Sequence, residues 1–504
     1  MMIYLSIALI AVSYFVYWIL TKNNGYWKKR NIAGPKPEPL FGNIKDLALH
    51  KKFIGTVIED LYNQCPNEKI VGFYRMIRPS LLIRDLDFIK HIMIKDFDMF
   101  MDRGIGLAKD GLGANLFTAD GDTWRILRTK FTPLFTSGKL KNMFPLIAER
   151  ADRLFDCLDN VNESSEQDIQ LITNRYTISS IAACAFGLDI DLRSADEPIL
   201  EILYRLNKLI LEARYGIEFL AMIPGILKTL NTIVFPTEVT NFFHDLVRSV
   251  FTQRNGVPST RKDFMDLILE MKQQKVIRGS KLVDDEQISV ELTEGMIAAQ
   301  AFVFYVAGFE TSSTTLSFLL YELAKNPEIQ DKLIKEVDEA LEKSKGNITY
   351  DVLMDLPYMS KVFDETLRKY PVVDPLQRCA INDYKIPGTD LTIKKGEVLF
   401  VSVVGIHYDE KYYPNPEIFD PERFSAENSR NRHPCAYLPF GTGPRNCIGM
   451  RFAKVQSRMF IVKLLSQYRV ETSENTPKNM KPDPNRVFLG PDQRVILKLV
   501  PRHR

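Results

Sequence analysis

The chain of 504 residues contains one stretch that is long and apolar enough to cross a membrane, and this stretch lies at its beginning. Residues 3–20 carry no charge and are mainly Ile, Leu, Val, Ala and aromatic residues. A bilayer span takes about twenty apolar residues, so the run is just sufficient. A cleaved signal peptide is the alternative. It is disfavoured because no basic segment precedes the run, no small-residue cleavage site follows it, and Lys22, Lys28, Lys29 and Arg30 come next.

Positive charge after the span predicts a retained anchor over residues 1–21, with the chain from about Lys22 onward in the cytosol. Residues 22–43 combine the basic patch with Gly34-Pro35-Lys36-Pro37-Glu38-Pro39. Three prolines in this segment favour a stiff extended backbone, so we predict a hinge that fixes how the globular part meets the bilayer. An ordinary loop remains the alternative.

Residues 44–504 show no repeat, no low-complexity tract and no linker that divides them. With 45% hydrophobic and 26% charged residues, the chain is neither disordered nor a polytopic membrane protein. The net charge of +3 indicates no polyanionic partner, so we expect no nucleic-acid binding. Six cysteines without a C-x-x-C pair exclude a disulfide framework and a zinc cage.

Helical periodicity dominates this long region. Apolar stripes at a spacing of three to four residues predict helices over 145–158 and 329–341. The apolar run 296–309 is too short for a membrane span and contains Gln300, so it predicts a buried core helix. Strand patterns are fewer: 71–83 is typical of a hairpin turning at Arg78-Pro79-Ser80, and 385–406 of strands broken by turns. A mainly α fold with a minor β-sheet is therefore predicted.

The segment from Phe440 to Gly449 carries the strongest motif, F-x-x-G-x-R-x-C-x-G. A chance match to its five fixed positions in such a chain has a probability below about one in ten thousand. This loop resembles that of the cytochrome P450 family, and the resemblance implies that Gly443 and Gly449 let the backbone pass close to a flat macrocycle and offer amide hydrogens to the Cys447 sulfur. The pattern after Gly449 is helical, and a helix N-terminus lowers a thiol pKa. These features suit a thiolate ligand of haem iron.

This segment resembles the cytochrome P450 family, and the resemblance extends over essentially the whole chain. It implies the P450 fold with an N-terminal transmembrane anchor, and a cytosolic haem-thiolate monooxygenase domain over residues 44–504. The implied cofactor is haem b (iron-protoporphyrin IX), with Cys447 as axial ligand of the iron and O₂ as cosubstrate. The other cysteines, Cys65, Cys157, Cys184, Cys379 and Cys435, are interpreted as unreactive.

Further motifs follow the family's order. Glu365-Thr366-Leu367-Arg368 matches E-x-x-R, and Arg423 lies in P-x-x-F-x-P-x-R-F. By resemblance, these three charged residues form a buried structural network. The haem would contact Trp124 and Arg128 of a W-x-x-x-R pair, together with the remaining predicted cofactor-binding residues: Arg103, Arg378, Phe440, Arg445 and Gly449. The arginines suit the propionates because the guanidinium fork pairs with a carboxylate.

The segment Gly308-Phe309-Glu310-Thr311 resembles the family's oxygen-activation motif. The resemblance implies that Gly308 opens a groove in the core helix over the iron. Thr311 would hold a water molecule by a hydrogen bond, and Glu310 would help to relay protons; these two are the predicted catalytic residues. For Ser312 and Ser313, a hydrogen bond to the carbonyl four residues earlier is the expectation.

The chain has neither G-x-G-x-x-G nor G-x-x-x-x-G-K-S/T, so electrons are expected from a partner. The resemblance implies NADPH–cytochrome P450 reductase and leaves cytochrome b5 open as a second donor. Residues 428–470 hold eight Lys plus Arg and no acid, and residues 123–148 hold five and no acid. A basic face beside the haem is therefore predicted, which suits an acidic flavoprotein. A peroxide-rearranging enzyme without a reductase is disfavoured by Glu310 and Thr311.

Within the family, Phe309-Glu310-Thr311-Ser312 and the cysteine loop are most similar to insect microsomal enzymes that oxidise xenobiotics. This likeness implies small lipophilic substrates such as plant toxins and insecticides, and an endoplasmic reticulum membrane location. A dedicated hydroxylase or epoxidase of an endogenous steroid, terpenoid hormone or fatty acid is the alternative. The implied pocket includes residues 104–117, 302–311 and 372–376. Within it, Asp374 is interpreted as a turn residue, or else as a carboxylate that favours cationic substrates.

Overall fold

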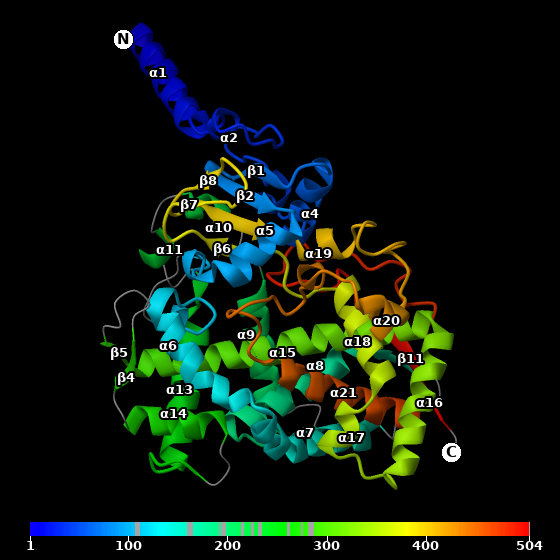
Figure 1. Ribbon diagram of the computed structural model, residues 1–504. Helices are drawn as coiled ribbons and strands as arrows, with labels where there is room; N and C mark the ends of the chain where they lie inside the picture. The colour runs from blue at the N-terminus through cyan, green and yellow to red at the C-terminus, as the bar shows by residue number, and fades with distance from the viewer. Residues whose placement is uncertain are drawn as a thin grey trace.

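The computed structural model describes residues 1–105, 111–158, 165–190, 192, 198–212, 216–222, 226–229, 234–259, 263–273, 276–280 and 287–502. Its first element is helix α1 (Met2–Thr21), which projects from the rest of the molecule without burying any residue (Figure 1). In the described part of the chain it is the one helix long and apolar enough to span a membrane, with a mean hydropathy of 2.1. The predicted apolar helix at the N-terminus is thus confirmed.

The globular part is mainly helical. Its long helices are α4 (Ile54–Gln64), α6 (Gly121–Phe131), α7 (Ser137–Leu158), α8 (Ile169–Ile181), α9 (Pro198–Leu211), α13 (Thr237–Gln253), α14 (Phe264–Gln273), α15 (Glu294–Lys325), α16 (Pro327–Lys343), α18 (Pro357–Lys369) and α21 (Met450–Gln467). Its short helices are α2 (Tyr26–Lys29), α3 (Lys45–Ala48), α5 (Leu86–Lys90), α10 (Ile217–Ala221), α11 (Ile226–Thr229), α17 (Tyr350–Met354), α19 (Val403–His407) and α20 (Ala426–Ser429). The predicted helices over 145–158 and 329–341 lie within α7 and α16.

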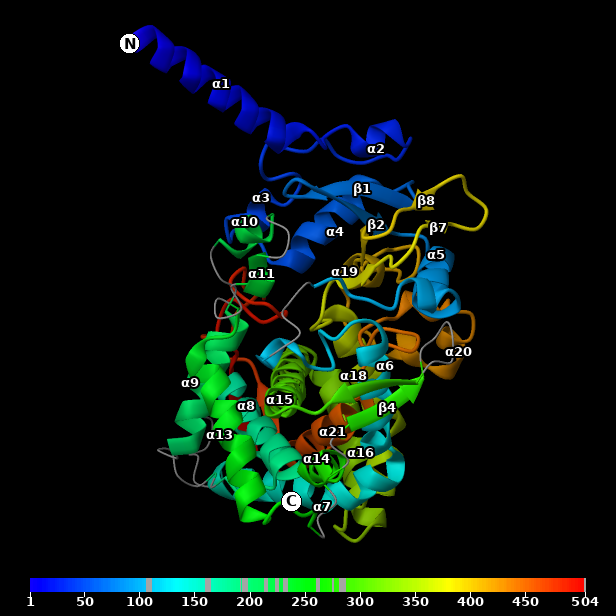
Figure 2. The ribbon, with the colours of Figure 1, turned by 90° about the vertical axis from the view of Figure 1, so that its left-hand side faces the viewer.

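Helix α15 runs through the middle of this helical body and packs against α8, α13, α18 and α21 (Figures 1 and 2). It is buried on most of its circumference because apolar and small residues follow one another without a polar face. The core helix predicted over 296–309 is therefore confirmed; it begins two residues earlier, at Glu294, and continues well beyond the predicted end to Lys325. Gln300 is completely buried. Its side-chain oxygen accepts a hydrogen bond from the Leu116 amide, and its side-chain nitrogen donates to the Ala114 carbonyl.

The β-structure is small. Its strands are β1 (Ile70–Arg75), β2 (Arg78–Ile83), β3 (Glu166–Asp168), β4 (Val276–Ser280), β5 (Gln287–Glu291), β6 (Leu376–Cys379), β7 (Tyr384–Lys385), β8 (Thr392–Ile393), β9 (Val398–Val401), β10 (Tyr468–Glu471) and β11 (Ile496–Pro501). They form a four-stranded sheet in the order β1-β2-β9-β6, a three-stranded sheet in the order β10-β11-β3, and two hairpins.

The hairpin predicted over 71–83 exists, but its turn lies at Met76-Ile77 and not at Arg78-Pro79-Ser80. Met76 adopts a φ of 55°, which closes the tight turn. Pro79 is tolerated in β2 because pairing with β9 begins one residue later, at Ser80. The strand prediction over 385–406 is wrong at its end, where residues 403–407 form α19. The Ser402 hydroxyl accepts a hydrogen bond from the Gly405 amide at 3.0 Å and thereby starts this helix.

The segment after the anchor packs on the first strand of the four-stranded sheet. Trp27 of α2 is 2% exposed and donates its indole N–H to the Phe73 carbonyl at 3.0 Å. The Gly72 amide donates to the Ala33 carbonyl at 2.8 Å. A Cβ on Gly34 would lie 1.8 Å from the Gly72 carbonyl oxygen, so this approach requires glycine. Figure 2 shows α2 beside β1, between the anchor and the helical body.

Candidate active site

The cysteine loop precedes helix α21 and is held by its own backbone. The Cys447 amide donates to the Phe440 carbonyl at 2.8 Å, and the Gly441 amide to the Leu438 carbonyl at 2.9 Å. Gly449 is the N-cap of the 18-residue helix α21, so the cysteine lies two residues before this N-cap, near a helix N-terminus as predicted. The Cys447 side chain is accessible, whereas Cys184 and Cys435 are buried. The loop therefore presents one thiol at the positive end of a long helix.

The glycines of this loop differ in their roles. Gly443 has a φ of +75°, and a Cβ there would lie 1.8 Å from the Met93 carbonyl oxygen. Glycine is therefore required at position 443 for close contact with another backbone segment, and the expected approach of this residue to a macrocycle stays a prediction. Gly449 has no such conflict, and its backbone amide acts to lower the pKa of the Cys447 thiol. This effect supports the prediction of an amide donor to the sulfur at Gly449.

Two opposing effects act on the pKa of the Cys447 thiol. Although the side chain is accessible at the surface, desolvation by the surrounding protein raises the pKa of Cys447, while the Gly449 amide and the nearby Arg128 and Arg103 guanidiniums act to lower this pKa. Burial raises the pKa of Cys379 and of Cys435 to about 11. Because the thiolate is the form that binds iron, Cys447 is the cysteine whose surroundings favour ligation.

Arg128 of α6 holds the cysteine loop directly. Its Nη1 donates to the Asn446 carbonyl at 2.7 Å, and its Nη2 donates to Asn446 Oδ1 at 2.8 Å. Both terminal nitrogens are engaged by the residue that precedes Cys447. Arg128, the arginine of the W-x-x-x-R motif, therefore lies at the cysteine loop. The motif does not indicate its contact with Asn446. Asn446 is a site residue that motif matching missed, since it occupies a variable position.

Three further predicted arginines, Arg103, Arg378 and Arg445, lie near one another, and Arg445 belongs to the cysteine loop itself. Arg445 is 3% exposed and donates to the carbonyls of Met101, Phe117 and Ala119. Its guanidinium lies over the Trp124 ring, 5.1 Å from the centroid. Burial lowers the pKa of Arg445 to about 10 and that of Arg378 to about 9, and the charge of Arg445 adds to the shift at Arg378. Burial, Arg445 and Arg378 also lower the pKa of Arg103.

This cluster has more positive charge than its surroundings neutralise. Asp120 lies 3.8 Å from Arg445, and the Nε atoms of Arg378 and Arg445 are buried without a hydrogen-bond partner in the described part of the chain. Buried unpaired guanidiniums are costly unless an anion accompanies them. A bound group with two carboxylates would supply it, so these residues fit the propionates of a haem whose iron is ligated by Cys447.

Helix α15 contributes an accessible face with Thr311. Ala307 and Thr311, four residues apart, are accessible although most of α15 is buried, and the Thr311 hydroxyl donates to the Ala307 carbonyl at 2.7 Å. A Cβ on Gly308 would lie 2.7 Å from Ile181 Cδ1 of α8, while the groove expected at this residue stays a prediction. This glycine permits close helix packing. Among the described residues, no hydrogen bond joins Thr311 to the cysteine loop or to the arginines.

The two serines after Thr311 also differ from expectation. Ser313 does not bond the carbonyl four residues earlier; its hydroxyl bonds Thr173 at 3.0 Å and the Asn174 side chain, both on α8. The Ser312 hydroxyl is buried without a partner in the described part of the chain. Tertiary packing against α8 replaces the local hydrogen bond because the Thr173 hydroxyl lies within reach across the helix interface.

Glu310 is 1% exposed and its carboxylate is fully engaged. Arg486, from the loop before β11, donates to Glu310 Oε1, and Asn207 of α9 donates to Glu310 Oε2 at 3.1 Å. The Val487 amide donates to the Leu211 carbonyl at 2.9 Å, so the same loop is also bound to the end of α9. Arg486 is a residue that sequence reasoning missed, since no local motif marks an isolated arginine in a loop.

The predicted charged network is present and buried. Arg368 Nε and Nη2 donate to the two Glu365 oxygens at 2.7 and 2.9 Å, with both side chains 0% exposed. Arg423 lies 3.4 Å from Glu365 and donates to the Pro414 and Asn415 carbonyls at 2.7 and 2.8 Å. The expected three-residue network is thus confirmed.

Asp374 precedes strand β6. Its Oδ1 accepts a hydrogen bond from the Val403 amide at 2.5 Å, at the N-terminus of α19. A Cβ on Gly55 would lie 2.6 Å from its Oδ2. Asp374 is 4% exposed, and burial raises its pKa to about 7, with Glu59 adding to the shift. This position favours the interpretation of a turn and capping residue. Of the predicted pocket, residues 106–110 lie outside the described part of the chain.

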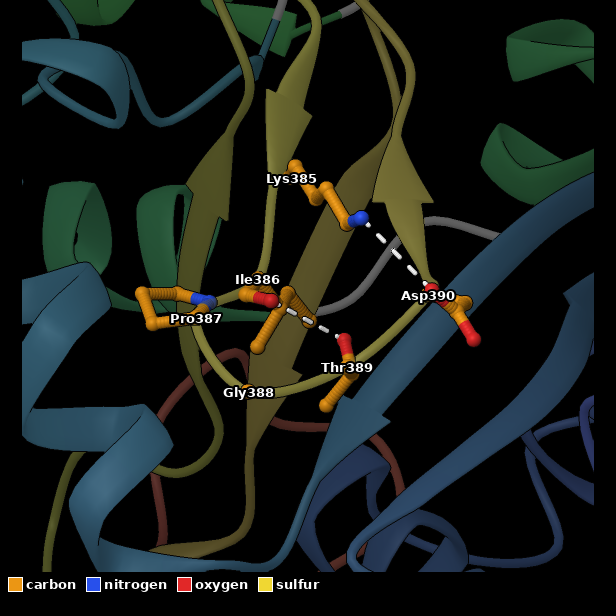
Figure 3. Close-up of a pocket in the computed structure, with 6 residues that line it drawn as sticks. All are labelled: Lys385, Ile386, Pro387, Gly388, Thr389 and Asp390. Atoms are coloured by element: carbon orange, nitrogen blue, oxygen red, sulfur yellow. Dashed lines mark hydrogen bonds and ion pairs between the residues drawn. The ribbon is translucent and has the colours of Figure 1, made fainter.

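A surface cavity of ≈ 400 Å³ lies at the β7–β8 turn, lined by residues 385–390 (Figure 3). Lys385 lies 3.5 Å from Asp390, and the Thr389 hydroxyl donates to the Ile386 carbonyl at 3.0 Å, so the turn is closed by its own side chains. None of the predicted catalytic or cofactor residues lies in this turn.

A mainly helical body, a cysteine presented by a glycine-rich loop at a helix N-terminus and a set of under-neutralised arginines define a haem-thiolate protein. A model of the family "Cytochrome P450" matches residues 32–499. The chain belongs to the cytochrome P450 family and is a P450 monooxygenase.

Individual relatives come from insects. The chain is 53% identical to Cytochrome P450 6B2 of Helicoverpa armigera over 97% of this chain and 96% of that protein. It is 52% identical to Cytochrome P450 6B1 of Papilio polyxenes over 99% of this chain and 100% of that protein. Identity to Cytochrome P450 6a2 of Drosophila melanogaster is 36%, over 97% of this chain and 98% of that protein. The chain is therefore similar over its whole length to insect P450 enzymes.

Proposed function

We propose that this P450 inserts one oxygen atom from O₂ into small lipophilic xenobiotics, such as plant toxins and insecticides. The observation that carries the proposal is the whole-length similarity to P450 enzymes of a moth and a butterfly at 52–53% identity. A hydroxylase or epoxidase of an endogenous steroid, terpenoid hormone or fatty acid is the alternative within the same chemistry.

A haem b group held by Cys447 and the arginines would supply the binding and reductive activation of O₂. The chain's residues position and protect this chemistry. Arg128 fixes the backbone before Cys447, and the Gly449 amide stabilises the thiolate by hydrogen bonding. Arg103, Arg378 and Arg445 would accept the propionates, with Trp124 stacked on Arg445.

Thr311 is the proposed proton donor site beside the substrate. Its hydroxyl hydrogen is directed at the Ala307 carbonyl, so the Thr311 oxygen is free to accept a hydrogen bond from a water molecule, and rotation of the hydroxyl lets it donate. Glu310 is the proposed second member of the proton path. Its carboxylate is held by Arg486, so proton transfer through Glu310 requires that this contact loosens.

We further propose that NADPH–cytochrome P450 reductase supplies the electrons, with cytochrome b5 as a second acidic donor. Fewer cations are available on the proposed basic face than the sequence indicates. In 428–470, Lys454, Lys463 and Arg469 pair with aspartates, while Arg445 and Arg458 are buried. Apart from Arg128, which binds Asn446, and the buried Arg458, the cations of the two basic segments that lack an ion pair among the described residues are Lys130, Lys139, Arg430, Arg432 and Arg451. They suffice for a docking patch, and turnover with the reductase is expected to fall as salt increases.

The location follows from the anchor. Helix α1 and the cations after it support an endoplasmic reticulum protein with a single N-terminal anchor and its catalytic domain on the cytosolic side. Protease treatment of intact microsomes would degrade the catalytic domain if the orientation is right, and would leave it intact if the orientation is reversed.

The deciding experiment uses the full chain in membranes with reductase and NADPH. A panel of plant toxins and insecticides is compared with steroids, terpenoid hormones and fatty acids under identical conditions. Oxidation of several unrelated toxins with little selectivity supports the xenobiotic role. Efficient oxidation of one hormone or fatty acid alone would instead establish the endogenous alternative.

A further inference from the structure

His407, the last residue of α19, connects the buried charged network to the cysteine loop. The histidine is 0% exposed. Its Nδ1 lies 2.9 Å from the Arg368 carbonyl oxygen, and the Leu438 amide donates to its Nε2 at 3.0 Å. Arg368 returns the contact, since its Nη1 donates to the His407 carbonyl at 2.9 Å. The imidazole thus bridges two chain segments that are 70 residues apart, Arg368 and Leu438.

The two contacts determine where the ring carries its proton. A carbonyl oxygen can only accept and a backbone amide can only donate, so Nδ1 carries the hydrogen and Nε2 offers its lone pair. Burial lowers the pKa of His407 to about 3, so the ring is neutral at pH 7. Tyr437 stacks on the ring, with 5.5 Å between centroids and an interplanar angle of 21°. The ring is therefore held in one tautomer and one orientation.

Leu438 begins the turn that presents Cys447. Its carbonyl accepts the Gly441 amide at 2.9 Å, and the Phe440 carbonyl two residues on accepts the Cys447 amide at 2.8 Å. The Leu438 amide is therefore the point at which the loop is tied to the Glu365–Arg368–Arg423 network. We propose that His407 is a positioning residue for the thiolate: its neutral Nε2 holds the Leu438 amide and thereby sets the cysteine loop.

The test compares His407→Gln with His407→Met in the full-length holoenzyme. Glutamine and methionine side chains have nearly the same shape, but only glutamine offers an oxygen that can accept the Leu438 N–H. Two quantities are measured: the Soret position of the reduced carbon monoxide complex, which reports thiolate ligation, and the rate of haem transfer to excess apomyoglobin. Because a single hydrogen bond is at stake, we expect His407→Met to transfer haem about three to ten times faster than His407→Gln.

We also expect a larger fraction of His407→Met than of His407→Gln to lose the thiolate Soret signature. His433→Gln is the matched control, because His433 Nδ1 also accepts a backbone amide, that of Cys435 at 3.1 Å, yet contacts neither Arg368 nor Leu438 through a hydrogen bond among the described residues. This control should behave as the wild type. Equal behaviour of His407→Gln and His407→Met, whether both intact or both impaired, would overturn the proposal, since only the acceptor distinguishes them.

Discussion

Glu310 of the core helix and Arg486 of the loop before β11 form an ion pair in which the Glu310 side chain is 1% exposed and the Arg486 side chain 18%. The two residues are 176 positions apart in the chain. Glu310 also accepts a hydrogen bond from Asn207 of α9, so this carboxylate connects α15, the helix that carries Thr311, to the loop before β11 and to α9. The position of the loop before β11 therefore affects Glu310, a proposed member of the proton path.

Replacing Arg486 by Gln should destabilise the protein, because the buried Glu310 carboxylate loses its counter-charge. We expect a loss of about 2–4 kcal/mol in the free energy of unfolding, measured by denaturant titration. The double variant Glu310→Gln/Arg486→Gln should recover part of this loss, since it removes the uncompensated charge. Strictly additive losses in the double variant would show that the two side chains do not interact.

Thr311→Ala should reduce the amount of product formed per NADPH consumed. The alanine removes the hydroxyl that bonds the Ala307 carbonyl and can hold a water molecule, while leaving the helix intact. We expect a loss of about tenfold in this ratio, which is smaller than the roughly hundredfold or greater effect that a positioned proton donor contributes to a rate. Thr311→Ser retains the hydroxyl and is the control. An unchanged ratio of product to NADPH in Thr311→Ala would refute the assigned role.

Removal of the charge at Glu365 should be severe. Both Glu365 and Arg368 are 0% exposed, so Glu365→Gln leaves a buried guanidinium without its bidentate partner. A loss of about 3–5 kcal/mol in the free energy of unfolding is expected. The control is Lys394→Ala, which breaks an ion pair with Asp383 whose side chains are each 54% exposed. That variant should lose less than about 1 kcal/mol, and comparable losses in both variants would contradict the expectation.

Arg128→Lys tests the contact with the cysteine loop. Lysine keeps the positive charge but cannot bond the Asn446 carbonyl and side chain at the same time. We expect haem to dissociate about ten times faster than from the wild type, measured by transfer to apomyoglobin. Arg125→Lys, at a partly exposed position 3.3 Å from Asp98, provides the comparison and should change little. If both variants hold haem as tightly as the wild type, the bidentate contact is unimportant.

Asp374→Asn should flatten the dependence of stability on pH. The pKa of Asp374 is raised from 3.8 to about 7 in the folded protein, so the stability that its proton contributes is fully present below about pH 4 and lost as pH rises through 7. Asparagine keeps an oxygen for the Val403 amide and carries no charge. At about pH 8 the variant should be more stable than the wild type by about 2–4 kcal/mol, and at about pH 4 the difference should vanish.

Two further measurements complete this prediction. Glu59→Gln should show a similar but separate effect, since burial, Asp60 and Glu417 raise the Glu59 pKa to about 7. The substrate preference of Asp374→Asn should equal that of the wild type, because Asp374 caps α19. A changed preference for cationic substrates would restore the alternative interpretation of this residue.

Much of the fold and of the cofactor site follows from local patterns in the sequence. The apolar helix α1, the long core helix and the cysteine loop before α21 could each be predicted from a short stretch of sequence. This is possible because helical periodicity and tight turns depend only on residues that are close together in the chain. The charged network was predictable because its motifs have fixed spacing. Where local patterns failed, as at residues 403–407, a helix cap at Ser402 outweighed an apolar, strand-like composition.

What the tertiary structure alone decided is which distant groups meet. Arg486 pairs with Glu310, Arg128 binds Asn446, and His407 bridges Arg368 and Leu438. Gly308 and Gly443 lie against Ile181 and Met93, contacts that no motif indicates. Such contacts depend on how helices and loops pack across many tens of residues. Since a buried polar group must find a partner wherever packing places one, its partner cannot be deduced from neighbours in the chain.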